Sequence, residues 1–336
     1  MTDISKGIVV STRIRLARNL EGFNFPSHLK GEKQAKEIIR LVSSAFSRFD
    51  EFRLYYMDAI SDEQAVCLVE NHLISPKLIK NKRYAAALIN REDNVSIMIN
   101  EEDHLREQCI VKGLDIKLAY ETMSEIDNNI SEKMKFAYDE QFGFLTACPT
   151  NLGTGLRASV MLFLPALTVN GLIPKVIRSI SRLGLTVRGV YGEGSDAEGY
   201  MYQISNEVTL GVSEEEILTQ VSDVVKKLCE LEDAERRSLA SGPSALDLRD
   251  ECMRAFGILT NCAKLSTGEL VKLMAKVKLG ACLGYLKISD VSELDSLVVK
   301  LRPSNINAAA EKQLSPLERD VYRARFCAKS LKKLAE

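Results

Sequence analysis

The sequence predicts an α+β domain over residues 1–235, followed by a smaller all-helical domain over residues 236–336. Three observations support this prediction. Strand-like and helix-like stretches alternate through the first two-thirds of the chain, two apolar strands there flank a charged turn, and the pattern from about Ser213 onward is helical. Such segregation of strands from helices is typical of the α+β class.

The first elements follow from local patterns. Residues 30–49 have the apolar spacing of a helix, and residues 52–57 have the composition of a strand. Ser61 with Gln64 three residues later forms a capping-box pattern, which predicts a helix over residues 61–74.

The next elements complete the first domain. Residues 83–89 and 94–100 are apolar strands on either side of "NREDN", which indicates an antiparallel hairpin. A long helix is predicted from Ile116 to Tyr138, and "FGFLTA" follows it. Two further strands, at 185–192 and 199–211, flank the glycine-rich "GEGSDAEG".

The second domain is predicted to contain helices only. "SGPS" at 241–244 and "RPSN" at 302–305 interrupt its helical pattern. Residues 274–287 resemble an amphipathic helix end with glycine stops, and they are a candidate part of a docking surface.

Composition limits the function classes. The chain is 46% hydrophobic and 27% charged with a formal net charge of −1, so we expect a soluble protein and no general attraction to nucleic acid or membranes. The first residues do not resemble a signal peptide, and no long uncharged apolar run predicts a membrane span. Eight scattered cysteines without a CxxC pair, beside three histidines, favour free thiols in a reducing cytoplasm over disulfides or a zinc site.

Four polar stretches adjoin apolar strands: "STRIRLAR" (11–18), "NEEDHLR" (100–106), "CPTNLGTGLR" (148–157) and "RGVYGEG" (188–194). Alternation along an extended chain places Arg13 and Arg15 on one face. If Arg106, Arg157 and Arg188 converge on them, the five guanidinium groups make a pocket for a polyphosphate. Separate surface ion pairs are the alternative, and the residues alone leave the two interpretations balanced.

Carboxylates accompany these arginines. Glu101, Glu102 and Asp103 are consecutive after an apolar strand, and Glu193 lies in the glycine-rich turn. A solvated turn is the ordinary explanation of such a run. The functional alternative is that the acids hold a cation, either Mg²⁺ or a guanidinium, beside bound phosphates.

The stretch "CPTNLGTGLRASV" (148–160) matches neither of two simple explanations. It lacks the GxxxxGK[ST] pattern of a Walker A loop. A nucleophilic Cys148 would need a base, and the sequence does not place any of the histidines beside it.

Together the four stretches resemble the phosphagen (guanidino) kinase family, which transfers phosphate from ATP to a guanidinium nitrogen. The NEEDHxR and CPTN-x-GT-x-x-RAS blocks carry the resemblance, which covers roughly residues 8 to 235. It implies an antiparallel sheet flanked by helices, and ATP with Mg²⁺ as the cofactors.

The resemblance also implies roles for single residues. Glu102 and Glu193 would bracket the substrate guanidinium, with Cys148 against the same group as a thiolate. One carboxylate can accept the guanidinium proton as the new bond forms. Mg²⁺ would arrive with ATP, with Glu101 as a candidate ligand. The candidate nucleotide-binding residues are Ser11, Arg13, Arg15, His72, Arg106, Arg157, Ala158, Ser159, Arg188 and Gly189.

A branch of this family has protein arginine as its acceptor. In the classical enzymes a sizeable helical domain precedes the STR-x-R motif, which here starts at residue 11, so we expect an open site that a folded protein's arginine can reach. "RGVYGEGSDA", "LGACLGYL" and "ERDVYRA" resemble bacterial protein-arginine kinases, which mark proteins for a Clp protease. This branch implies a cytoplasmic homodimer in protein quality control and stress response. Its implied partners are substrate proteins, a transcriptional repressor, a Clp unfoldase and an activator.

The stretch "RDVYRA" (319–324) resembles an allosteric phosphoarginine-binding element. Arg319 and Arg323 are four residues apart and share one face of the predicted helix, and Asp320 and Ala324 complete the element. A solvated helix face is the alternative that spacing alone favours.

Two other functions remain open from the sequence. The same chemistry would serve a kinase of a free guanidino metabolite such as arginine. A catalytically inactive adaptor that binds phosphoarginine through Arg319 and Arg323 is the second alternative, although the mapped catalytic positions carry the expected residue types.

Overall fold

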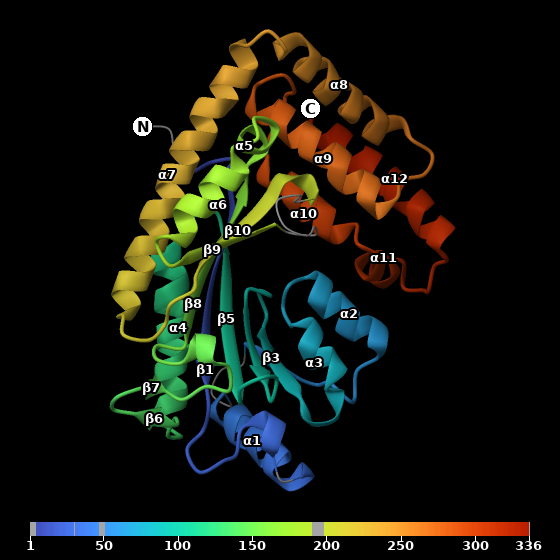
Figure 1. The fold of residues 1–336 in the computed structure, drawn as a ribbon. Coiled ribbons are helices and arrows are strands. Elements are labelled where there is room, and N and C mark those ends of the chain that lie inside the picture. The colour runs from blue at the N-terminus through green and yellow to red at the C-terminus, as the bar shows by residue number, and fades with distance from the viewer. Residues whose placement is uncertain (1–4, 30, 47–50, 190–197, 336) are drawn as a thin grey trace.

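The computed structural model describes residues 5–29, 31–46, 51–189 and 198–335. Its centre is an eight-stranded sheet of strand order β2-β3-β4-β5-β1-β8-β10-β9, in which every neighbouring pair is antiparallel (Figure 1). The strands are β1 (Val9–Arg18), β2 (Phe52–Tyr56), β3 (Ala86–Asn90), β4 (Val95–Ile99), β5 (Leu105–Lys112), β8 (Leu156–Phe163), β9 (Leu185–Gly189) and β10 (Met201–Asn206). A separate small hairpin pairs β6 (Tyr138–Asp139) with β7 (Gly143–Phe144).

Helices flank the sheet and then form the C-terminal part. Those of the first part are α1 (Glu32–Ala45), α2 (Asp62–Glu70), α3 (Pro76–Lys80), α4 (Ile116–Ser131), α5 (Pro165–Val169), α6 (Ile173–Ser181) and α7 (Glu214–Ser241). The later helices are α8 (Ala245–Asn261), α9 (Thr267–Cys282), α10 (Ser292–Lys300), α11 (Pro303–Ala310) and α12 (Pro316–Leu334). The predicted fold class, an antiparallel sheet flanked by helices and followed by a helical region, is confirmed.

One face of the sheet carries the main apolar core. Side chains such as Ile14, Val160 and Ile204 point to this face and pack with Met123 of α4 and Val221 of α7. Burial of these aliphatic groups is the main favourable term for this layer, at about 25 cal/mol per Å² of apolar surface. The residues between them along each strand therefore point to the opposite face.

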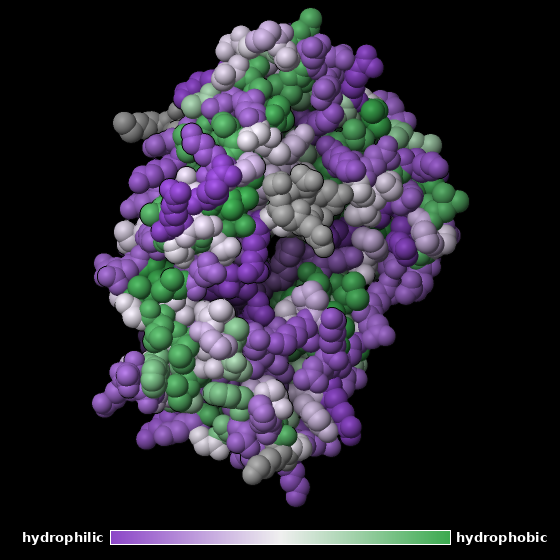
Figure 2. Space-filling view, viewed as in Figure 1, coloured by the Kyte–Doolittle hydropathy of each residue, from purple (hydrophilic) through white to green (hydrophobic). Residues whose placement is uncertain are grey.

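Within the part of the chain that the structure describes, the opposite face is covered only toward its two ends. At the β2–β3–β4 end, α2 and α3 pack on alternate strand residues such as Ala87 and Met98. At the other end, Ala275 and Leu279 of α9 pack on Phe163. Between these two coverings, Figure 2 shows a hollow near the middle of the molecule with hydrophilic side chains around it.

The C-terminal helices have their own core, built from apolar residues of α8, α9, α10, α11 and α12. In Figure 1 they stand across from α2 and α3, and α11 contacts α2. The helix α7 runs continuously past residue 235. The proposed division between residues 1–235 and 236–336 therefore lies within one helix and stays a prediction.

Most local predictions are confirmed. Ser61 and Gln64 form the capping box of α2, β3 pairs with β4 as the predicted hairpin, and Ser213 is the N-cap of α7. The helix predicted from Ile116 to Tyr138 is too long, because α4 ends at Ser131. After that residue the backbone pairs with the segment that follows β1, where Glu21 N donates to Lys135 O and Ala137 N donates to Asn19 O.

Other predicted bounds also change. The helix predicted over 61–74 is divided, since α2 ends at Glu70 and α3 begins at Pro76. The strand predicted over 199–211 is shorter and ends at Asn206. There the Asn206 amide donates to Leu156 O and Val208 O, which turns the chain away from the sheet.

Candidate active site

The register of the three central strands brings arginines together on the open face of the sheet. Arg15 of β1 lies directly opposite Arg157 of β8, and Ala17 of β1 lies opposite Arg106 of β5. Directly paired residues of antiparallel strands point to the same side, and so does Arg13, two residues before Arg15. Four of the five predicted arginines therefore converge.

The fifth arginine lies at the outer strands of the same face. Arg188 of β9 pairs with Gln203 of β10, and the Gln203 amide oxygen accepts a hydrogen bond of 3.1 Å from Arg13 Nη2. Arg188 also lies near enough to Arg157 for its charge to lower the pKa of Arg157. All five arginines therefore lie on one face of the sheet, as a polyphosphate-binding pocket requires.

The arginine cluster is crowded with positive charge. Burial, followed by repulsion from Arg106 and Arg157, lowers the pKa of Arg13 to about 10. Burial and the same neighbours lower the pKa of Arg15, and burial followed by Arg188 lowers the pKa of Arg157. The buried Nε atoms of Arg15 and Arg157 have no hydrogen-bond partner among the described residues. Such donors favour a bound anion with several oxygens.

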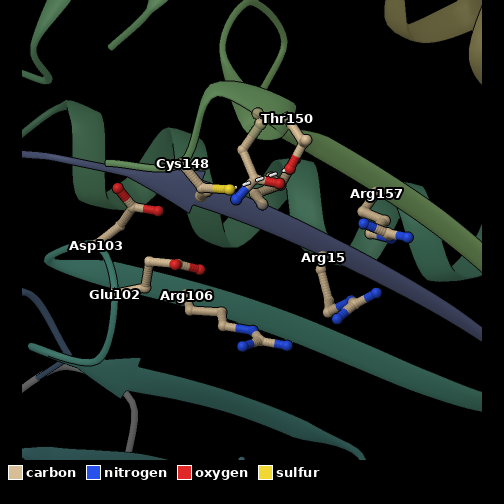
Figure 3. A pocket seen from close by; sticks show the side chains of 11 residues that line it. Arg15, Glu102, Asp103, Arg106, Cys148, Thr150 and Arg157 are labelled. Atoms are coloured by element: carbon tan, nitrogen blue, oxygen red, sulfur yellow. Dashed lines mark hydrogen bonds between the residues drawn. The ribbon is translucent and has the colours of Figure 1, made fainter. Parts of the chain in front are cut away.

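A cavity of about 220 Å³ lies against this cluster. Figure 3 shows Cys148 and Glu102 toward one end of it and Arg15 and Arg157 toward the other. Its lining is Arg15, Leu16, Ala17, Glu102, Asp103, Arg106, Cys148, Thr150, Asn151, Gly155 and Arg157. The cavity therefore joins candidate acceptor-binding groups to candidate phosphate-binding groups.

The two adjacent glutamates have different surroundings. The carboxylate of Glu101 is buried, pairs with Arg106 Nη1 at 2.8 Å, and accepts from Ser75 Oγ and from the backbone N–H of Glu102. Glu102 is partly exposed, and its Oε1 pairs with Lys77 Nζ at 2.9 Å. Glu101 thus holds Arg106 in place, whereas Glu102 faces the cavity.

The sequence singled out Asp103 only as one of three consecutive acids that could hold a cation, whereas in the structure it joins the two loops that carry Glu102 and Cys148. Its Oδ1 accepts from Asn19 Nδ2 at 2.7 Å and from Ala147 N at 2.6 Å. Burial raises the pKa of Asp103, while these two hydrogen bonds favour its ionised form. The signal available in the sequence was its place in the acidic run and the asparagine directly after "STRIRLAR".

Cys148 directly precedes a 3₁₀ turn of residues Pro149–Asn151, and its Sγ lies 3.1 Å from Thr150 Oγ1. Gly153 and Gly155 then adopt φ values of +108° and +65°. A Cβ at Gly153 would meet Thr209 O at 2.2 Å, so the backbone approach requires glycine there. These turns let Cys148 and Arg157 reach the same cavity.

The remaining predicted nucleotide residues are more dispersed. His72 follows α2 with a φ of 61°; neighbouring groups reduce the hydration of its ring, and this, followed by the charges of Arg13 and Arg302, lowers its pKa. Ser159 lies opposite Arg13 on the open face. Ser11 is two residues before Arg13 on the same strand.

The structure does not bring every predicted residue to the cavity. The side chain of Ala158 is buried in the core on the other face, and Ala158 N donates to Asn206 Oδ1. Gly189 ends β9 opposite Tyr202. Glu193 lies outside the described residues.

The C-terminal "RDVYRA" element lies on α12, and Arg323 within it is 1% exposed. Its guanidinium donates to Leu301 O and Leu265 O and pairs with Asp320 at 2.5 Å. Arg319 is partly exposed and donates to Leu314 O, and Ala324 is buried beside Arg323. The phosphoarginine role of this element stays a prediction.

Among the described residues, no group of three or more histidine, cysteine, aspartate or glutamate side chains could hold a metal ion. All eight cysteines are free thiols. Within the described ranges, none of the helices has the length and apolarity needed to cross a membrane.

Two protein families match consecutive parts of the chain. Residues 34–235 match the family described as ATP:guanido phosphotransferase, C-terminal catalytic domain. Residues 245–336 match the family described as protein-arginine kinase McsB C-terminal domain.

Individual relatives extend over nearly the whole chain. A protein-arginine kinase of Caldanaerobacter subterraneus subsp. tengcongensis is 43% identical over 99% of this chain and 99% of its own length. A protein-arginine kinase of Halothermothrix orenii is 42% identical over 95% of this chain and 91% of its own length.

Solved structures share the fold. A lombricine kinase aligns with a TM-score of 0.61 and 30% identity over 70% of this chain and 68% of its own. The duplicated taurocyamine kinase from Schistosoma mansoni, bound to transition-state-analogue components, aligns with a TM-score of 0.64 and 29% identity over 80% of this chain and 40% of its own.

Proposed function

The chain belongs to the ATP:guanido phosphotransferase family and is a phosphotransferase with a guanidino acceptor, and from this premise we propose that it phosphorylates arginine residues of proteins. The γ-phosphate of ATP is the group transferred. The observation that carries this proposal is the single cavity that joins Glu102 and Cys148 to the arginine cluster.

The arginines bind the triphosphate. The buried Nε atoms of Arg15 and Arg157 have no partner among the described residues, and Arg106 is oriented by Glu101. As the γ-phosphoryl group moves, guanidinium groups around it offset its negative charge, which is the largest single contribution that a protein makes to phosphoryl transfer.

The acceptor binds at the other end of the cavity. Glu102, together with Glu193, fixes the planar guanidinium in line with the γ-phosphate, and Cys148 lines the same end of the cavity. The nitrogen–phosphorus bond forms as the bond from phosphorus to the β–γ bridging oxygen breaks, and ADP leaves with that electron pair. One carboxylate takes the guanidinium proton.

Mg²⁺ enters this proposal with the nucleotide. The described residues offer no carboxylate cluster for it, and Glu101, the candidate ligand, is buried and bonded to Arg106 and Ser75. Mg²⁺ commonly binds through substrate phosphates and few protein ligands. When bound, it would supply further positive charge at the β- and γ-phosphates.

Protein arginine as the acceptor is supported by the relatives that match nearly the full chain and by the matched C-terminal family. The remaining proposals rest on the sequence resemblance to bacterial protein-arginine kinases: a cytoplasmic homodimer in stress response and protein quality control, whose products are marked for a Clp protease. A transcriptional repressor as substrate, an activator, and phosphoarginine sensing by Arg319 and Arg323 belong to the same proposal.

The direct test is phosphoarginine formation. The protein, ATP, Mg²⁺ and an unfolded basic protein should yield acid-labile phosphate on arginine, detected by mass spectrometry under non-acidic conditions. Glu102→Ala should abolish the product while leaving ATP binding intact. Full activity of Glu102→Ala would refute the assigned role of this residue.

A kinase of a free guanidino metabolite is the second candidate, because the fold is shared with lombricine kinase and taurocyamine kinase. The rate of ADP release distinguishes a protein-arginine kinase from a kinase of a free metabolite. Protein arginine should drive it much faster than free arginine, and equal rates with free arginine would favour the metabolite.

A further inference from the structure

The ion pair between Lys77 and Glu102 places a lysine of the protein beside the carboxylate that is to bind the substrate. Lys77 lies on α3 and Glu102 lies in the loop between β4 and β5, and Lys77 Nζ is 2.9 Å from Glu102 Oε1. This contact has no part in the chemistry described above. The Lys77–Glu102 pair has the same charges as the proposed complex of Glu102 with the substrate, but an ammonium takes the place of the substrate guanidinium.

Two contacts fix where α3 presents this lysine. Ser75, the N-cap of α3, accepts from Leu78 N through its Oγ and donates through the same hydroxyl to Glu101 Oε1. Leu78 is fully buried under the helix. The helix is therefore anchored to the loop of the two glutamates, and only the outer part of the Lys77 side chain is free to move.

We propose that Lys77 is a resident competitor for the acceptor position: it neutralises Glu102 in the free enzyme and must be displaced by the substrate guanidinium. This inference rests on the proposed function, and it adds a residue that sets the acceptor specificity.

The geometry favours arginine over lysine as the displacing group. An ammonium is a compact point charge, whereas a guanidinium presents two parallel N–H donors that match both oxygens of a carboxylate. Lys77 contacts one oxygen of Glu102 only. An incoming arginine gains a second hydrogen bond by replacing Lys77, and an incoming lysine gains nothing over the ammonium already present.

Exposure keeps the Lys77–Glu102 ion pair weak enough to open. The side chains of Lys77 and Glu102 are 55% and 35% exposed. Exposed ion pairs contribute little, so competition by Lys77 should weaken acceptor binding by about two- to fivefold. The substrate could displace a buried Lys77–Glu102 pair only at a much higher cost in free energy.

The test measures binding of an arginine peptide without turnover. With a non-hydrolysable ATP analogue and Mg²⁺ present, titration calorimetry should give a Kd for Lys77→Met that is about two- to fivefold lower than for the wild type. Lys80→Met is the matched control, because Lys80 is exposed on the same helix, and its Kd should equal the wild-type value.

A matched peptide with lysine in place of arginine supplies the specificity readout. It should compete poorly in the wild type and measurably better in Lys77→Met, since the variant leaves Glu102 open to either cation. In the kinetic assay, the KM for the arginine peptide should fall in Lys77→Met and kcat should stay the same.

Equal Kd values for Lys77→Met and the wild type would overturn the inference, as would a lower kcat with unchanged KM. Failure of the proposed function would look different: the wild type would form no phosphoarginine, while the Kd comparison would still report on Lys77.

Discussion

Arg15 and Arg18 lie three residues apart on β1, and their guanidinium groups meet opposite conditions on the two faces of the sheet. Arg18 is 1% exposed, pairs with Asp127 at 2.9 Å, and stacks on the Phe144 ring at 3.6 Å. Arg15 lies among Arg13, Arg106 and Arg157, and its buried Nε has no partner within the described structure.

This contrast separates an arginine that stabilises the fold from one that awaits a ligand. A buried cation is tolerated when it is paired and hydrogen-bonded, and Arg18 meets this condition. Arg15 does not, so folding gains little from it. Residues kept at a cost to stability are concentrated at functional sites.

The largest effect is expected from Arg15→Met. Loss of a guanidinium that holds the transferring phosphoryl group should lower kcat/KM by about 10³- to 10⁵-fold. The same change removes a buried charge from a repulsive cluster, so the urea midpoint should not fall. Steady-state kinetics and urea unfolding measure the two quantities, and activity within tenfold of the wild type would break the comparison.

Arg18→Met should give the reverse result. It leaves Asp127 without its buried partner, and removal of one member of such a pair costs about 3–5 kcal/mol of the free energy of unfolding. Urea unfolding beside Arg15→Met checks this. Wild-type stability in Arg18→Met would show that the two arginines do not differ in the way described.

His104 extends the comparison to a second buried basic group, whose protonation depends on pH. His104 is fully buried, accepts from Leu20 N at Nδ1 and contacts Asn24 O through Nε2, and burial lowers its pKa to about 4. In the unfolded chain its pKa is about 6.5. The unfolded state therefore binds more protons between these values, and the stability from neutral His104 is complete above pH 6.5 and is lost as the pH falls toward 4.

The expected loss between pH 7 and pH 4.5 is about 2–3 kcal/mol from this group. Urea unfolding at both values should show it in the wild type, and the His104→Asn variant should lack this part of the slope. Identical slopes would mean that folding leaves the pKa of His104 unchanged, which would contradict this account.

The sequence predicts what short-range patterns determine. The Ser61–Gln64 capping box, the β3–β4 hairpin and the shared side of Arg13 and Arg15 are all local, and the structure contains each of them. The predicted end of α4 was wrong because the residues after Ser131 form backbone hydrogen bonds with the segment after β1, which is distant in sequence, instead of continuing the helix.

Contacts between distant segments could not be predicted from these patterns. The register that sets Arg15 opposite Arg157, the bridge from Asp103 to Ala147, and the approach of Lys77 to Glu102 all depend on tertiary packing. The family resemblance supplied the candidate site residues, and the structure adds Asp103 and Lys77 beside them.

Ligand-induced stabilisation tests the central claim, that the open face of the sheet is built to bind a triphosphate. The thermal midpoint should be measured against ATP concentration with Mg²⁺ for the wild type, Arg15→Met and Arg18→Met. Binding to the folded state raises the midpoint in proportion to RT ln(1 + [L]/Kd). We predict a rise for the wild type and for the less stable Arg18→Met, and almost none for Arg15→Met. An equal rise in Arg15→Met and the wild type would contradict the assignment of this face.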